Sequence, residues 1–285
     1  MTFTRTIVAL TFTLLPVALF AQDSGDDGEL TDAQRFYQSL NWEAGPGNFD
    51  VTNFATIDLP EGFDRLNESD TARLMDFFEN PGSVGEFYVG PIDERWFALF
   101  SYEDTGHVED DEDIDADALL DSIRAGTEVG NEERRRRGWA EMNIVGWQSK
   151  PAYSDQTNRL SWAILAESAG EEIVNYNTRL LGRTGVISAV LVAEPAILDT
   201  SIAEFETLLE GFAYNPGQTC AEYKPGDKLA TYGLAALVTG GAAVAVTKGL
   251  NSGTLKAIGL AILAGFAFLW GRIKRLFRGK DTPSA

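Results

Sequence analysis

The sequence contains one cysteine and one histidine among its 285 residues. A single cysteine, Cys220, excludes an intrachain disulfide, so an exported domain must be held together by its core. A Ser-His-Asp or Cys-His relay would have to use His107, which stands beside Gly106 with no nucleophile motif such as GxSxG nearby. One histidine and one cysteine also cannot complete a tetrahedral zinc site. We therefore predict no metal site and no cofactor.

Phosphate-binding loops are missing as well, since neither GxxxxGK[ST] nor GxGxxG occurs. The net charge is −20, and residues 22–223 alone carry −28. Such a domain repels nucleic acid and anionic head groups, so a nucleic-acid partner is not expected. The charge is interpreted as a solubility device in a salty compartment. A surface for cationic partners or divalent metal is the alternative.

The N-terminus has the pattern of a secretory signal peptide. Arg5 precedes an apolar run over residues 7–20 that is too short to span a bilayer comfortably, and Ala21 offers a small residue for cleavage. We predict a signal peptide over 1–21 and a flexible acidic leader over 22–29. Leu19 is less usual than alanine at its position, so an uncleaved anchor is the rival interpretation.

Two apolar runs near the C-terminus, residues 229–246 and 255–271, predict a membrane segment. Each is roughly 26 Å long as a helix, which is marginal for a hydrocarbon core of roughly 30 Å. Glycines in both runs suit close helix packing, and Trp270 is a typical interfacial anchor. A two-helix hairpin over 229–271 is the simplest expectation, with the lipid bilayer as a partner.

The basic tail, residues 272–285, conflicts with that hairpin. Five of its residues are lysine or arginine, which favours the cytoplasm. A hairpin would return the tail to the periplasm, on the same side as the exported domain. A single span would keep it cytoplasmic, with one run, preferably 229–246, outside the bilayer or packed on a partner. Both topologies stay open, and either places the chain in a bacterial-type inner membrane with its main domain periplasmic.

The exported domain is expected over residues 30–217, followed by a linker over 218–228. Helices are predicted over 30–40, from Ser69 or Asp70 to 78, and over 118–137 and 201–210. Strands are predicted over 54–59, 96–102, 144–147, 160–167, 173–181, 185–193 and 211–214. Neighbouring strands in pairs, with helices between groups, favour an α+β fold with a largely antiparallel sheet and packed helices, followed by C-terminal membrane helices.

An acidic run precedes the longest predicted helix. Asp113, Asp115 and Asp117 alternate as in the opening of a calcium loop, but Ala118 and Arg124 occupy the positions that need glycine and glutamate. The EF-hand motif therefore fails. Asp115 and Asp117 are interpreted as caps of the helix, which also suits its positive N-terminal dipole.

Residues 175–179 (NYNTR) are polar where a buried strand should be apolar on one side. In a strand, Asn175, Asn177 and Arg179 share one face, while Tyr176 and Thr178 share the other. The first three residues are the predicted binding residues, because their face can line a polar groove. Pairing with acidic neighbours in the sheet is the alternative.

These elements resemble a family of membrane-anchored proteins, domain of unknown function family 2167. The resemblance is carried by residues 54–62 (FATIDLPEG), 96–106 (WFALFSYEDTG), 113–126 (DIDADALLDSIRAG), 131–139 (NEERRRRGW), 174–185 (VNYNTRLLGRTG), 211–217 (GFAYNPG) and 232–237. It implies an exported domain with C-terminal membrane helices and no established activity. The opening strand and the closing helix before Gly-Phe-x-Tyr are also similar to PsbP-type domains, at the level of fold alone.

We therefore expect a membrane-anchored envelope protein of unknown biochemical activity, with a binding or scaffolding domain and an envelope protein as a possible partner. The alternative is a hydrolase or another enzyme that uses carboxylates, with Glu103, Asp104 and Asp113 as the residues to mutate first. A non-enzymatic function is preferred.

Overall fold

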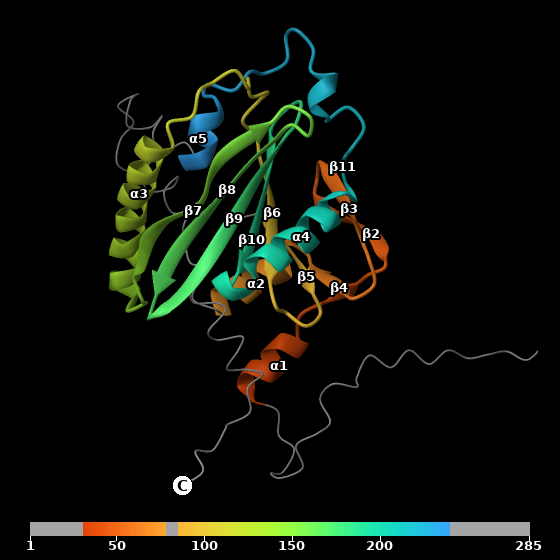
Figure 1. Cartoon of the computed structure of the whole chain (residues 1–285). Helices are drawn as coiled ribbons and strands as arrows, with labels where there is room; N and C mark the ends of the chain where they lie inside the picture. The colour runs from red at the N-terminus through yellow and green to blue at the C-terminus, as the bar shows by residue number, and fades with distance from the viewer. Residues whose placement is uncertain (1–30, 78–84, 240–285) are drawn as a thin grey trace, which may run out of the picture.

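The computed structural model describes residues 31–77 and 85–239, and its centre is an eight-stranded antiparallel sheet (Figure 1). In spatial order the strands are β1 (Glu43–Ala44), β4 (Phe63–Leu66), β5 (Phe87–Pro91), β6 (Phe97–Glu103), β10 (Val186–Ala193), β9 (Glu171–Leu181), β8 (Arg159–Ser168) and β7 (Met142–Ser154). A smaller sheet is formed by β11 (Phe212–Tyr214), β3 (Ala55–Leu59) and β2 (Gly47–Thr52). The α+β class and the antiparallel sheet are thus confirmed.

The two faces of the large sheet are covered by different elements. The small sheet and α4 (Leu198–Leu209) cover one face, where Phe205 and Leu208 pack against Leu191 and other side chains of the central strands. The opposite face carries α2 (Glu68–Phe77), α3 (Ala116–Arg137) and α5 (Leu234–Thr239). Because β8 and β10 are covered on both sides, their sequences are apolar over most positions, whereas β9 carries polar residues in its middle.

Helix starts follow local capping rules. The side chain of Thr31 forms a capping box with Gln34 at the start of α1 (Asp32–Gln38). Asp115 accepts hydrogen bonds from the N–H groups of Asp117 and Ala118, which confirms it as the cap of α3. The expected cap of α2 at Ser69 or Asp70 was wrong, since Asn67 Oδ1 accepts from the Asp70 N–H at 3.0 Å and the helix begins at Glu68.

The chain beyond Gly217 is fixed to the domain rather than extending away from it. It forms a short 3-10 helix, η2 (Cys220–Glu222), and then α5, whose Leu234, Leu237 and Val238 are each 1% exposed. These three pack with Leu119, Ile123 and Trp162 of α3 and β8, and the carboxylate of Glu112 accepts from the Ala235 N–H at 3.0 Å. The first six helical residues of the apolar run 229–246 therefore belong to the core of the domain.

The remaining targeting predictions fall outside the described residues. These are the signal peptide over 1–21, the leader over 22–29, most of the membrane segment over 229–271 and the basic tail over 272–285. Within residues 31–77 and 85–239, no helix combines the length and the apolarity needed to cross a membrane.

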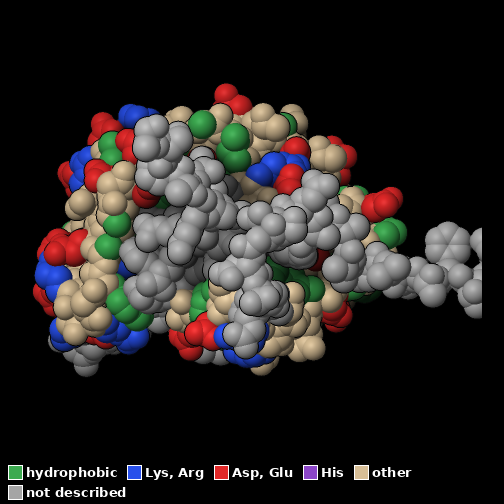
Figure 2. All heavy atoms as spheres, turned by 90° about the horizontal axis from the view of Figure 1, so that it is seen from below, with side chains coloured by type: hydrophobic (Ala, Val, Ile, Leu, Met, Phe, Trp, Pro, Cys, Tyr) green, Lys and Arg blue, Asp and Glu red, His purple; other side chains and the backbone are tan. Residues whose placement is uncertain are grey.

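The surface carries both signs of charge despite the acidic composition. The face in Figure 2 shows carboxylates and basic side chains interspersed around its edge. Several of these groups pair locally on helices, as Arg137 does with Glu133 at 2.7 Å. Such exposed pairs contribute little to stability.

Candidate functional site

The three predicted binding residues lie together on the face of β9 that is directed toward α3 and α5. Asn175, Asn177 and Arg179 are 3%, 6% and 4% exposed, and we call these three residues the polar stripe. The register places Trp162 of β8 and Val190 of β10 on either side of Asn177. Tyr176 points the other way, toward Phe205 of α4. The stripe thus follows β9 at the middle of the large sheet, with Ser188 of β10 beside Arg179.

Arg179 has few partners for a buried cation. Its guanidinium carbon lies 4.9 Å from the centre of the Trp162 ring, and its Nε lies 4.0 Å from a carboxylate oxygen of Glu103. The second distance is too long for a hydrogen bond. Among the described residues neither Nε nor Nη1 has a hydrogen-bond partner. Burial lowers the pKa of Arg179, because desolvation disfavours the charged form.

The two asparagines are only partly satisfied. Asn177 donates its side-chain amide to the Asn175 carbonyl at 3.0 Å, which fixes the orientation of its amide group. Asn175 Oδ1 is buried and has no partner among the residues described. A buried amide oxygen without a donor costs on the order of 1–3 kcal/mol, so the stripe combines two kinds of unsatisfied polar group.

Tyr232, just before α5, stands close to Arg179 and Glu103. Burial, and then the negative charge of Glu103, raise the pKa of Tyr232 to about 12, while the positive charge of Arg179 acts in the opposite direction. The tyrosine is therefore a neutral hydroxyl at physiological pH. The Arg179 end of the stripe is formed by β6, β9 and the segment leading into α5.

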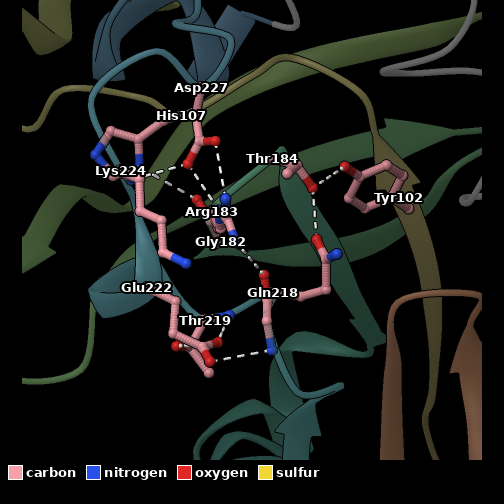
Figure 3. A network of polar contacts seen from close by, with 11 residues as sticks. Tyr102, His107, Gly182, Arg183, Thr184, Gln218, Thr219, Glu222, Lys224 and Asp227 are labelled. Atoms are coloured by element: carbon pink, nitrogen blue, oxygen red, sulfur yellow. Dashed lines mark hydrogen bonds and ion pairs between the residues drawn. The ribbon is translucent and has the colours of Figure 1, made fainter.

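A second polar network, shown in Figure 3, fastens the chain beyond Gly217 to the turn between β9 and β10. Arg183 makes two hydrogen bonds to the Asp227 carboxylate, at 2.7 and 2.9 Å. Thr184 donates to Gln218 at 2.6 Å, and Glu222 accepts from Thr219 and from the Gly217 N–H. We call Arg183, Thr184, Gln218, Glu222 and Asp227 the clasp. The Arg183 hydrogen bonds lower the pKa of Asp227 to about 2.

His107 serves this second network. Its ring stacks on Tyr223 with centroids 4.1 Å apart, and its backbone exchanges hydrogen bonds with Lys228 and Ala230, both at 2.8 Å. Gly106, at φ +88°, allows this approach, because a Cβ there would meet the Lys228 carbonyl at 2.6 Å. His107 and the clasp therefore have a structural role: they hold the segment that leads to α5 against the domain.

Two carboxylates in an aromatic cluster were not anticipated from the sequence. Burial raises the pKa of Asp64 to about 7 and that of Glu94 to about 8. The Tyr37 hydroxyl donates to Glu94, and the Tyr37 ring packs at a tilt against Trp42, which contacts Tyr88 edge-on. Burial, and then the negative charge of Asp64, raise the pKa of Tyr88, and the second effect places Asp64 near the same cluster.

Three carboxylates of the acidic run before α3 hold neighbouring elements in place. Asp110 accepts from the Tyr153 hydroxyl at 2.8 Å, Glu112 caps α5, and Asp115 caps α3. Within the described ranges no group of three His, Cys, Asp or Glu side chains is arranged to hold an ion. Cys220 is half-buried, and burial raises the pKa of its thiol, which disfavours the reactive thiolate.

Sequence reasoning placed the polar stripe on one face of a strand but missed its neighbours. Glu103 was considered only as a catalytic carboxylate, and Trp162 and Tyr232 were not considered at all. Trp162 is 17 residues from Arg179 in sequence, and Tyr232 is 53 residues away. Only the strand register and the docking of α5 bring them together, and a single sequence carries no direct signal for either.

Comparison with known families gives one match that covers most of the chain. The model of a family described as "Protein of unknown function (DUF2167)" matches residues 43–270. No curated protein matches the chain. The matched range includes both sheets, the polar stripe, the clasp and both C-terminal apolar runs.

Among solved structures, the chain is similar to the solution structure of cyanobacterial PsbP (CyanoP) from Synechocystis sp. PCC 6803. The identity is 12%, the TM-score is 0.36, and the match covers 68% of this chain and 99% of that one. Nothing about the function of the present chain follows from a likeness at this level.

Proposed function

Because this chain belongs to the family described as "Protein of unknown function (DUF2167)", whose description names no activity, we propose a function from its own residues. The protein is a membrane-anchored envelope protein. One transmembrane helix tethers the folded domain, which binds another envelope component through the polar stripe. The domain is exported by the N-terminal signal and lies on the periplasmic side of the inner membrane.

The observation that carries this proposal is the position of α5. The apolar run 229–246 was the first half of the expected hairpin, yet Leu234, Leu237 and Val238 are buried against Leu119 and Trp162. A residue packed in the domain core cannot at the same time face lipid. The seven residues that remain of this run, 240–246, give a helix of only about 10 Å, far less than a bilayer requires.

The run over 255–271 then serves as the single span. Its composition is more strongly apolar than that of the first run, and Trp270 stands at its end. A single span places the basic tail on the cytoplasmic side when the domain is periplasmic, which agrees with the positive-inside tendency. The conflict that the hairpin creates between tail charge and topology is thereby removed.

The chemistry of the polar stripe favours binding over catalysis. An arginine stays protonated across the physiological range, and asparagine amides do not titrate, so these groups cannot act as general acid or base. They are donors and acceptors in fixed positions on a rigid sheet, which suits recognition. A binding protein tethered beside the membrane is the function that these groups support.

Extraction of membranes with alkaline carbonate tests the anchor. The full chain should stay in the pellet, whereas a chain ending at Thr239 should be released while keeping α5 and the clasp. Release of the full chain under the same conditions would contradict membrane anchoring.

Photocrosslinking tests binding through the stripe. A photoreactive amino acid in place of the half-buried Val190, beside Asn177, should crosslink to a partner in intact cells. The same probe in place of Ile92 is the control. Ile92 is 64% exposed and directly follows β5, which β6 and β10 separate from β9. Equal crosslinking from the two positions would argue against a partner at the stripe.

The carboxylate cluster favours a second candidate function, a carboxylate-dependent enzyme. Asp64 and Glu94 have pKa values near neutrality, which is what general acid–base catalysis requires. The pKa values of the two carboxyl groups can be measured by infrared absorption as the pH is varied. Comparison of the wild type with Asp64→Asn and Glu94→Gln assigns each pKa to its residue and tests this second candidate. Titration of both groups near pH 4 would remove its basis.

A further inference from the structure

The buried end of the polar stripe has a charge that Glu103 balances from 4.0 Å, but two nitrogens of its guanidinium lack hydrogen-bond acceptors among the described residues. Arg179 is 4% exposed, and its Nε and Nη1 lack a hydrogen-bond partner among the described residues. Burying a cation in this way is costly unless charged acceptors satisfy it. The buried Arg179 therefore points to a ligand that supplies the missing acceptor.

The neighbours limit the chemistry of that ligand. One face of the Arg179 guanidinium lies on the Trp162 ring. The N–H groups lie in the guanidinium plane, so an acceptor has to approach them from the edge of the guanidinium. Glu103 is 4.0 Å away, and 38% of its side chain is exposed, so it balances charge without making the hydrogen bonds. A cationic ligand is excluded by Arg179 itself. A planar carboxylate matches the donor geometry of a guanidinium and forms short, charge-assisted hydrogen bonds with it.

At the other end of the stripe the ligand has to supply a hydrogen-bond donor instead of an acceptor. Asn175 Oδ1 is a buried acceptor without a donor among the described residues. Asn175 and Arg179 are four positions apart on one strand, so their Cα atoms are about 13 Å apart at about 3.3 Å per residue. The long arginine side chain shortens the span that a ligand has to bridge. A ligand of tripeptide size can therefore present a carboxylate to Arg179 and an N–H or O–H donor to Asn175.

We propose that the polar stripe binds the carboxylate of an organic ligand that also carries a hydrogen-bond donor. Arg179 holds the carboxylate, Asn175 accepts from the donor, and Trp162 forms the apolar wall. Tyr232 and α5 lie at the Arg179 end, so the ligand binds beside this short helix. The inference rests on the proposed binding role of the stripe and names the ligand class for it.

Thermal unfolding of the detergent-solubilised full chain provides the test, with three probes at 10 mM. Triglycine carries a free carboxylate and amide donors, triglycine amide lacks the carboxylate, and acetate lacks the donors. Triglycine should raise the unfolding midpoint, and triglycine amide should not. A rise with acetate of the same size would assign binding to a free small carboxylate, whereas a larger rise with triglycine would assign it to a peptide-like one. No rise with either carboxylate, or an equal rise with the amide, would overturn the proposal.

Matched variants link the effect to the stripe. Arg179→Gln should weaken triglycine binding at least about tenfold, since a charge-assisted hydrogen bond is lost. Glu103→Gln should strengthen binding, because it removes a competing carboxylate, and this variant keeps the test valid if Arg179→Gln does not fold. Arg136→Gln, at an exposed position of α3 where the guanidinium pairs with Glu133, should leave binding unchanged. Unaltered binding in both stripe variants would also overturn the proposal. Carbonate extraction is unaffected by these outcomes, so a failed ligand assignment is distinguishable from a failed anchor.

Discussion

At the scale of single residues, the main feature of this protein is a polar stripe buried in the large sheet. Arg179 and Asn175 each keep buried polar atoms without hydrogen bonds among the described residues. Groups of this kind reduce stability, and proteins generally retain them where function requires them. The stripe is therefore expected to show a trade-off between stability and binding.

Replacing Arg179 with methionine should stabilise the ligand-free protein. The change removes the desolvation cost of the buried cation, while Glu103 is exposed enough to be hydrated alone. The expected gain is about 1 kcal/mol, or a rise of roughly 2–4 °C in the unfolding midpoint. Calorimetry on the detergent-solubilised chain measures it.

Arg134→Met is the matched control for this prediction. Arg134 is 5% exposed, but its Nη1 donates to the Ala140 carbonyl at 3.1 Å. Its loss should destabilise the protein by about 1–3 kcal/mol. Equal destabilisation by the two substitutions would show that Arg179 is a satisfied structural residue.

Glu94 gives a prediction for the pH dependence of stability. Burial raises its pKa from 4.5 to about 8, so the folded state keeps a proton that the unfolded state releases above about pH 4.5. Stability should therefore fall as the pH rises from about 5 to about 8. Glu94→Gln stays neutral and can still accept from Tyr37, so it should remove part of this slope. Midpoints measured at four pH values provide the comparison, and identical slopes in the two proteins would refute the assignment.

At the scale of elements, long regular patterns were predictable and short irregular ones were not. The central strands β8 and β10 follow from apolar runs bounded by turns, and the cap Asp115 follows from its position before a helical pattern. Strand β4 has only four residues, two of them charged, and β2 begins with Gly-Asn, a composition typical of turns. Pairing with β5 and β3 forms these strands, and pairing is not encoded locally.

The placement of α5 shows a more general limit. Leucine, alanine and valine suit a protein core and a bilayer equally well, so the apolar run 229–246 predicts burial without saying in what. The clasp explains why α5 packs into the domain core. Arg183 and Asp227 hold the preceding segment on the sheet, and α5 then begins beside α3.

Substitution of Leu237 by alanine tests the docking of α5. The side chain is 1% exposed in a cluster with Ile123 and Trp162, so its truncation should destabilise the domain by about 2–4 kcal/mol. Leu260→Ala, in the run assigned to the bilayer, should leave the unfolding midpoint of the domain unchanged. Chemical denaturation followed by tryptophan fluorescence measures both variants, and the opposite ranking would place the first run in the membrane.

At the scale of the whole molecule, the single-span topology that we propose joins an acidic domain to a basic tail through the apolar run 255–271. The domain repels anionic head groups, which keeps its bulk off the membrane surface, while the tail is attracted to them. In the topology that we propose, docking of α5 would keep the domain close to the membrane, because only the residues between Thr239 and the proposed span over 255–271 would connect the two. The proposed binding site beside α5 would then face partners near the membrane.

The single-span topology is the central claim of this account, and the position of the C-terminus tests it most directly. A reporter enzyme that is active only in the periplasm, fused after Ala285, should be inactive, because one span places the tail in the cytoplasm. The same reporter fused after Thr239, at the end of the docked helix, should be active and confirms export of the domain. Periplasmic activity of the Ala285 fusion would mean that the chain returns through the bilayer, and it would contradict the assignment of α5 to the domain.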